Sequence, residues 1–262
     1  MGGRIGPCPR SRPYFGRDRA NPRPQCSGTG WIDMQNSAAS LGSRAFTGTA
    51  KFVITLAAMI FLPAGSVTYG QGWVFLVNFS TCAIVMTIYF LKRDPALLER
   101  RLRAGPGAER QASQKIIQLL ASVVVCAMVV ASALDHRFGW SDVPMSAVVI
   151  GNALVVLGFA IILVVFRENS FASATIEVGA DQKVISTGPY AWVRHPMYAG
   201  AIPLFSGVPL ALGSWWALLV IAPLVAILVV RLLDEERYLV RNLPGYAAYC
   251  TKVRYRLLPA LW

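Results

Sequence analysis

Charged residues are scarce in this sequence. They make up 15% of its 262 residues, whereas hydrophobic residues make up 55%, and an ordinary soluble domain carries about a quarter charged residues. This scarcity excludes a typical soluble domain and predicts an integral membrane protein. Acidic residues number 13 and basic residues 25. This surplus of positive charge suits anionic headgroups or an inside-facing surface.

Cysteine and histidine are also rare, and their spacing excludes several classes of site. The five cysteines include no close pair, and two of them lie inside apolar runs, so we expect neither a disulfide framework nor a metal site. Of the two histidines, His136 has no site-like neighbours, and we expect it to have no functional role. No DNA- or RNA-binding motif accompanies the basic surplus, so nucleic acid is not an expected partner.

Residues 1–45 lack any apolar periodicity and are rich in Arg, Pro and Gly. Such a segment cannot bury enough surface to fold alone. We therefore expect a disordered basic tail over 1–45 and a membrane domain over 46–262. A translation start at Met34 is an alternative to a tail that touches lipid.

Four apolar runs have close to the ~20 residues that a helix needs to cross a bilayer; they are residues 51–69, 72–91, 116–134 and 145–166. A longer apolar region, 196–232, is interrupted by LGSWW and has Pro203, Pro209 and Pro223 inside its runs. We interpret its halves, 196–212 and 215–232, as a helical hairpin whose neighbours satisfy the carbonyls that proline frees. The predicted fold class is an all-α integral membrane protein with about six transmembrane helices, four plus this hairpin.

Basic residues alternate between the connections. The tail up to Lys51 has eight, residues 92–115 have seven, residues 167–194 have three and the chain from Arg231 onward has six, whereas the remaining connections hold only Arg137. The positive-inside rule then places both termini and the two basic loops in the cytoplasm. The membrane would be the inner membrane of a bacterium or the endoplasmic reticulum of a eukaryote.

Residues 188–200, GPYAWVRHPMYAG, join a turn to the start of an apolar helix. Pro196 suits the first helical position, which puts His195 at the cytoplasmic mouth of the fifth helix. The exposed amides there favour an anion, and the Arg194 guanidinium fits a carboxylate or phosphate. The alternative is that Arg194 reaches to headgroups and His195 is an incidental interfacial residue.

A second polar cluster, RLLDEERYL over residues 231–239, follows the sixth span. On a helix Arg231 and Glu235 are one turn apart and can pair, whereas Glu236 points to another face. A solvated helix end is the alternative interpretation. Ionisable residues at membrane depth are nevertheless functional candidates, and this cluster emerges on the same side as His195.

These motifs resemble those of the isoprenylcysteine carboxyl methyltransferase and phospholipid methyltransferase group of membrane enzymes. The resemblance is carried by TGPYAWVRHPMYAG, an apolar hairpin and RLLDEERYLVRNLPGYAAYCTKVRYRLLP, and extends to RDPALLERRL at 93–102 and RENSFAS at 167–173. It implies S-adenosylmethionine in a cytoplasm-facing pocket within residues 183–262 and a lipid acceptor that enters from the bilayer.

Carried onto this chain, the resemblance implies a set of site residues. Those expected to contact the cofactor are Gly188, Pro189, Tyr190, His195, Tyr198, Glu235 and Glu236, and the guanidinium chemistry above adds Arg194. Arg231 and Glu236 have the family's spacing for a catalytic pair beside the transferred methyl. A regular helix pairs Arg231 with Glu235 instead, so either glutamate is a candidate partner of Arg231.

The acceptor decides the mechanism. Methyl transfer from a sulfonium is an in-line displacement in which the protein supplies alignment and electrostatics. A prenylcysteine carboxylate or a thiolate needs only a cation such as Arg231 to orient it. A phospholipid amine must lose a proton, which would give Glu236 the role of base.

Two other classes are alternatives. Membrane sterol and steroid reductases also carry Arg-His-Pro-x-Tyr, but they bind a nicotinamide cofactor, NADPH in this reading, and typically have Asn where this chain has Met197. A non-enzymatic scaffold or transporter is disfavoured, because the four secure spans have no ionisable residue in their interiors to define a path.

Overall fold

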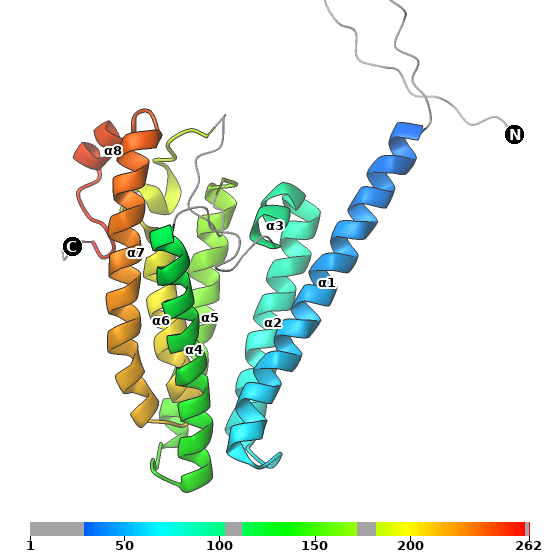
Figure 1. Ribbon diagram of the computed structural model, residues 1–262, viewed down its shortest axis with the longest axis vertical. Helices are drawn as coiled ribbons and strands as arrows, with labels where there is room; N and C mark the ends of the chain where they lie inside the picture. The colour runs from blue at the N-terminus through cyan, green and yellow to red at the C-terminus, as the bar shows by residue number, and fades with distance from the viewer. Residues whose placement is uncertain (1–28, 103–111, 172–181, 260–261) are drawn as a thin grey trace, which may run out of the picture. The chain divides into compact units, whose positions relative to one another are not determined.

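The structure is a computed structural model that describes residues 29–102, 112–171, 182–259 and 262. Every regular element within these residues is helical, so the predicted all-α class is confirmed (Figure 1). The α-helices are α1 (Thr29–Ala64), α2 (Gly70–Arg93), α3 (Pro95–Leu102), α4 (Ala112–Phe138), α5 (Met145–Glu168), α6 (Pro196–Ala211), α7 (Ile221–Asn242) and α8 (Tyr246–Lys252), and the 3-10 helices are η1 (Gly188–Ala191) and η2 (Trp216–Val220).

Two compact units make up the chain, Met1–Ser37 and Ala38–Trp262. The described part of the first unit is the beginning of α1, residues 29–37. The second unit holds the remaining helices, and the rest of the description concerns it alone.

Five helices of the described chain are long and apolar enough to cross a membrane, which confirms an integral membrane protein. They comprise Ser40–Ala64, Gly70–Arg93, Ala112–Phe138, Met145–Glu168 and Trp216–Asn242. The first half of the predicted hairpin, residues 196–212, is α6, whose 16 residues are fewer than the ~20 that a full crossing needs. Pro196 sets its start, and the turn at Gly213, where φ is 72°, follows its end.

The expectation of disorder up to residue 45 is corrected by α1, which begins at Thr29. Leu41 and Ala45 are buried, and Ala45 belongs to a core cluster with Phe90 and Leu97. Residues 38–50 are rich in alanine and contain no proline, so they extend the first membrane helix. Residues 1–28 of the expected tail lie outside the described residues.

Glycines allow α5 and α6 to pack closely. A Cβ on Gly151 would collide with the backbone nitrogen of Ala211, and one on Gly158 would collide with Leu204. Small residues of this kind let membrane helices approach to backbone contact. The close packing fixes the start of α6, and therefore His195, against the end of α5.

The two ends of the second unit differ in content. Figure 1 shows η1, α3 and α8 at one end, together with the ends of α2, α5 and α7, whereas the turns α1–α2, α4–α5 and α6–α7 lie at the other. We refer to these as the α8 end and the hairpin end. Exposed tryptophans lie at both ends, as expected where a protein meets the two membrane surfaces. They are Trp73, Trp140, Trp215 and Trp216 at the hairpin end and Trp192, directly after η1, at the α8 end. The two predicted polar motifs both lie at the α8 end.

Candidate active site

The Arg-His-Pro segment is held by the C-terminal chain. His195 is the N-cap residue of α6 and Pro196 is its first residue, as predicted. The backbone N–H groups of Arg194 and His195 donate to the carbonyls of Tyr255 and Arg256, each at 2.9 Å. This pairing across about 60 residues fixes the segment in an extended conformation beside α7.

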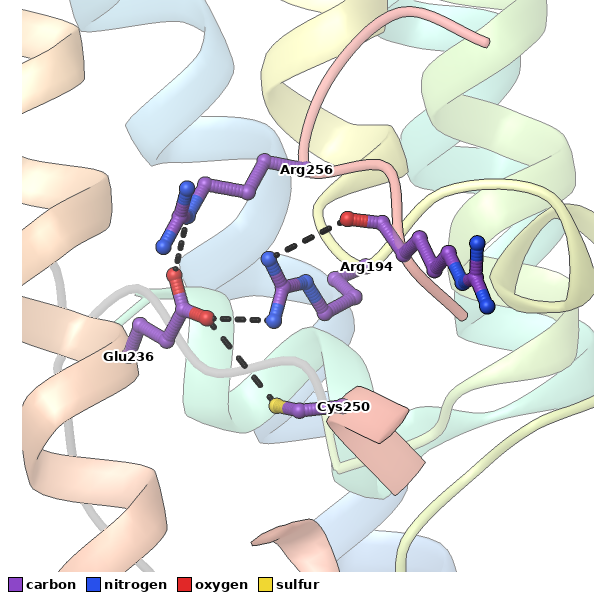
Figure 2. Close-up of polar contacts among 5 residues, drawn as sticks. Arg194, Glu236, Cys250 and Arg256 are labelled. Atoms are coloured by element: carbon purple, nitrogen blue, oxygen red, sulfur yellow. Dashed lines mark hydrogen bonds and ion pairs between the residues drawn. The ribbon is translucent and has the colours of Figure 1, made fainter. Parts of the chain in front are cut away.

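Glu236 lies between two guanidinium groups. Its Oε1 is 2.6 Å from Nη1 of Arg194, and its Oε2 is 2.7 Å from Nε of Arg256 (Figure 2). The Cys250 thiol lies 3.9 Å from Oε1, and Arg194 also donates to the Arg254 carbonyl at 3.4 Å. Both Arg194 and Glu236 are buried. This cluster ties α7, the Arg-His segment and the C-terminal chain together.

The Arg231 side chain contacts residues other than Glu236, one of its expected partners. It donates to Oε1 of Gln118 on α4 at 2.6 Å and lies close to the Tyr198 hydroxyl. That hydroxyl donates to Oε2 of Glu235 at 2.6 Å. Since five residues advance a helix by well over one turn, Arg231 and Glu236 face different sides of α7, and Glu235 shares the Tyr198 neighbourhood with Arg231.

A cavity of about 800 Å³, its open mouth included, lies beside these groups. Five of the predicted residues line it, and these are Tyr190, Arg194, His195, Tyr198 and Glu235. We call it the polar cavity.

The remaining predicted residues lie outside the lining of the polar cavity. Gly188 has a φ of 55°, and a Cβ there would collide with the Glu168 carboxylate, so this position requires glycine. Thr187 donates a hydrogen bond to the same carboxylate. Gly188 and Pro189 therefore shape η1. Glu236 affects the polar cavity through its ion pair with Arg194.

His195 is the clearest indication of a ligand. Its ring is buried, it lines the polar cavity, and its Nε2 has no hydrogen-bond partner among the described residues. Burial, together with the nearby charges of Arg194 and Arg256, lowers the pKa of His195 to about 3. The ring is thus neutral at physiological pH. Buried polar atoms are nearly always satisfied, so this nitrogen is suited to bind a ligand.

Aromatic residues that the sequence analysis did not select complete the polar cavity. Tyr246 and Tyr249 of α8 line it, and the Tyr249 hydroxyl donates to the Tyr190 carbonyl at 2.7 Å. Asn169 donates to the Tyr190 hydroxyl at 3.0 Å, and burial raises the pKa of Tyr190 to about 12. The only sequence signal for α8 was Pro244-Gly245, which turns the chain with a φ of 85° at Gly245.

Comparison with known families places the site in context. Residues 146–244 match the family model described as phospholipid methyltransferase. The predicted resemblance is confirmed over these residues, and the match supports a methyltransferase. A comparison with curated proteins gives no match.

The matched segment contains η1, α6, η2, α7 and all but the first residue of α5. It includes Arg194, His195, Tyr198, Glu235 and Glu236. Arg256 and the tyrosines of α8 follow the matched segment in the chain. The polar cavity is therefore assembled from family residues and from a C-terminal segment that the family match does not include.

Proposed function

We propose that this protein transfers a methyl group from S-adenosylmethionine to a lipid-like acceptor at the membrane surface. The observation that carries the proposal is the unpartnered Nε2 of the neutral His195 in a cavity that also presents Glu235 and tyrosines. The family match supplies the reaction class. The positive-inside rule supports a cytoplasmic position for the polar cavity and both termini.

The residues of the polar cavity fit the cofactor chemically. S-adenosylmethionine, when bound, supplies a methyl group on a positively charged sulfur. The Glu235 carboxylate is suited to its ammonium group, and Arg194 to its carboxylate. The neutral His195 provides a hydrogen bond without adding positive charge next to a cation. Tyr190, with its pKa raised to about 12, stays a neutral aromatic that favours a cation at its face.

The geometry favours different roles for the two glutamates. Glu235 lines the polar cavity and belongs to the cofactor site. Glu236 is bound by Arg194 and Arg256 and does not reach the cavity lining, so we assign it a positioning role instead of the base role considered from the sequence. Arg231, beside Tyr198, keeps the role of orienting the acceptor.

Titration calorimetry on detergent-purified protein tests the proposal. We expect saturable binding of S-adenosylmethionine and no binding of NADPH. Glu235→Gln should lower the affinity for S-adenosylmethionine at least tenfold, since a lost charge-assisted hydrogen bond is worth about 1.5–3 kcal/mol. Glu99→Gln, an exposed carboxylate on α3, is the matched control. Binding of NADPH alone would overturn the assignment in favour of a reductase.

A further inference from the structure

The first turns of α4 present polar side chains to α7. The Gln114 amide donates to Oδ2 of Asp234, and the Ser113 hydroxyl donates to the same oxygen at 3.1 Å. One turn further along α4, Oε1 of Gln118 accepts the hydrogen bond from Arg231 at 2.6 Å. Residues four apart lie on the same face of a helix. A single face of α4 therefore holds two ionic side chains of α7.

The contact made by Gln118 continues to the polar cavity. Arg231 is buried and hydrogen-bonds the Tyr198 hydroxyl, which donates to Oε2 of Glu235 at 2.6 Å. Tyr198 and Glu235 both line the polar cavity. We call this series, from Gln118 through Arg231 and Tyr198 to Glu235, the Gln118 chain. The contact to Asp234 stops short of the cavity, since Asp234 is not among the described residues that line it.

Each link of the Gln118 chain orients the next. A guanidinium presents its N–H donors in fixed directions, so the acceptor oxygen of Gln118 sets the plane of Arg231. The hydrogen bond from Arg231 uses an acceptor position on the Tyr198 hydroxyl, and the O–H of that hydroxyl is directed at Glu235. Buried hydrogen bonds in series also polarise and strengthen one another. The Glu235 carboxylate is thereby held in one orientation beside the cavity.

We propose that Gln118 is a positioning residue, which acts through Arg231 and Tyr198 to aim the Glu235 carboxylate at an ammonium group in the polar cavity. This inference rests on the proposed function, in which Glu235 binds the ammonium group of S-adenosylmethionine. A carboxylate that is not held in place binds an ammonium group less tightly, because the strength of a hydrogen bond depends on its geometry. The role extends the cofactor site to α4, which precedes the matched residues 146–244.

Titration calorimetry with two ligands separates positioning from a general loss of structure. The ligands are S-adenosylhomocysteine and its deaminated analogue, which keeps the adenosine, the sulfur and the carboxylate but lacks the ammonium group. Gln118→Met removes the acceptor oxygen at nearly constant size and should lower the affinity for S-adenosylhomocysteine about fivefold. The affinity for the deaminated analogue should stay within about twofold of wild type. In a Glu235→Gln background, Gln118→Met should have no further effect on either affinity.

Gln114→Met is the matched control, because it removes an amide from the same α4–α7 contact but does not belong to the Gln118 chain. It should leave the ratio of the two affinities unchanged. Gln118→Glu keeps an acceptor oxygen at the same reach and should hold the affinity for S-adenosylhomocysteine within about twofold of wild type. Equal losses for both ligands in Gln118→Met would show that Gln118 only supports the fold. A loss in Gln118→Glu as large as that in Gln118→Met would overturn the acceptor role.

A double-mutant cycle without any ligand tests the Gln118 chain independently of the cofactor. The effects of Gln118→Met and Tyr198→Phe on the free energy of unfolding in detergent should be non-additive, because members of one hydrogen-bond network couple. The effects of Gln114→Met and Tyr198→Phe should add. Additive effects in the first pair would overturn the chain. If the wild type binds neither ligand, the proposed function fails together with this role; if it binds S-adenosylhomocysteine and Gln118→Met leaves the ratio unchanged, only the role of Gln118 fails.

Discussion

The two ends of the second unit contain similar residues in different settings. At the hairpin end Asp135 is buried and accepts hydrogen bonds from the hydroxyls of Ser141, at 2.6 Å, and Ser214. Those hydroxyls accept the backbone N–H groups of Trp215 and Ala217, each at 3.0 Å. This network joins the turn after α4 to the turn after α6. It resembles the Glu236 cluster in burial but uses uncharged donors.

The histidines differ in the same way. His136 stacks on Tyr69, with ring centres 3.8 Å apart, and lies at the hairpin end. His195 lines a cavity and has an unpartnered nitrogen. The comparison teaches that burial of ionisable groups does not by itself mark a site. A buried histidine that has an unpartnered nitrogen and also lines a cavity is a stronger indication of a ligand site.

The largest expected effect is that of Glu236→Gln. Removing one partner of a buried ion pair typically costs about 3–5 kcal/mol, because a buried guanidinium loses its counter-charge. We expect a large drop in the free energy of unfolding and weaker cofactor binding, since Arg194 and the C-terminal chain lose their anchor. Thermal unfolding in detergent and calorimetry measure the two effects.

Asp135→Asn is the counterpart at the hairpin end. It should lower the free energy of unfolding by about 1–3 kcal/mol through disrupted hydrogen bonds. The affinity for S-adenosylmethionine should stay within about twofold of wild type, because changes at distant sites act independently. Equal losses of affinity in both variants would show that the two ends are not functionally distinct.

A dependence of stability on pH is the next largest effect. The pKa of His195 is about 3 in the folded protein against 6.5 as the ordinary value, so the unfolded chain binds the extra proton first as pH falls. The contribution of His195 to stability is complete above pH 6.5 and is lost progressively between pH 6.5 and about 3. From pH 7 to pH 5 this loss amounts to about 2 kcal/mol.

His195→Gln should flatten this part of the stability profile, measured by chemical unfolding at several pH values. His136→Gln is the matched control. A wild-type profile that stays as flat as that of His195→Gln would contradict the burial of an unprotonated ring.

Cofactor affinity should distinguish the two histidines. His195→Ala removes one hydrogen-bond partner of the cofactor and should lower the affinity for S-adenosylmethionine about tenfold. His136→Ala should leave the affinity unchanged, because its ring contacts Tyr69 at the other end. Calorimetry on both variants gives the comparison, and equal affinities would return His195 to the role of an interfacial residue.

The smallest expected effect is that of Tyr249→Phe. It removes the hydrogen bond from the hydroxyl to the Tyr190 carbonyl and should cost about 1 kcal/mol of stability. We expect a fewfold loss of cofactor affinity through a less constrained η1. Tyr255→Phe, at an exposed position, serves as the control. A stability and affinity equal to wild type would exclude a role for this contact.

Much of the fold could be predicted because hydropathy and charge report directly on the membrane. The first four spans, the hairpin and the shared end of the two polar motifs follow from apolar runs and from the placement of Lys and Arg. The bounds of α6 also followed, because Pro196 marks its start and the turn at Gly213 follows its end.

The site was less predictable. The motif residues lie close together in space, as expected. The ion pair between Glu236 and Arg256 was not predicted, because Arg256 lies 20 residues further along the chain. The pairing of Arg194 and His195 with the C-terminal chain uses backbone atoms, which leave no mark in the sequence.

The measurement that tests the central claim most directly is photochemical crosslinking of radiolabelled S-adenosylmethionine to the wild-type protein, followed by peptide mapping. The account predicts label in the peptides that contain Tyr190 and His195 or Tyr246 and Tyr249, competed by unlabelled cofactor. Label at the hairpin end, or none in folded protein, would contradict it.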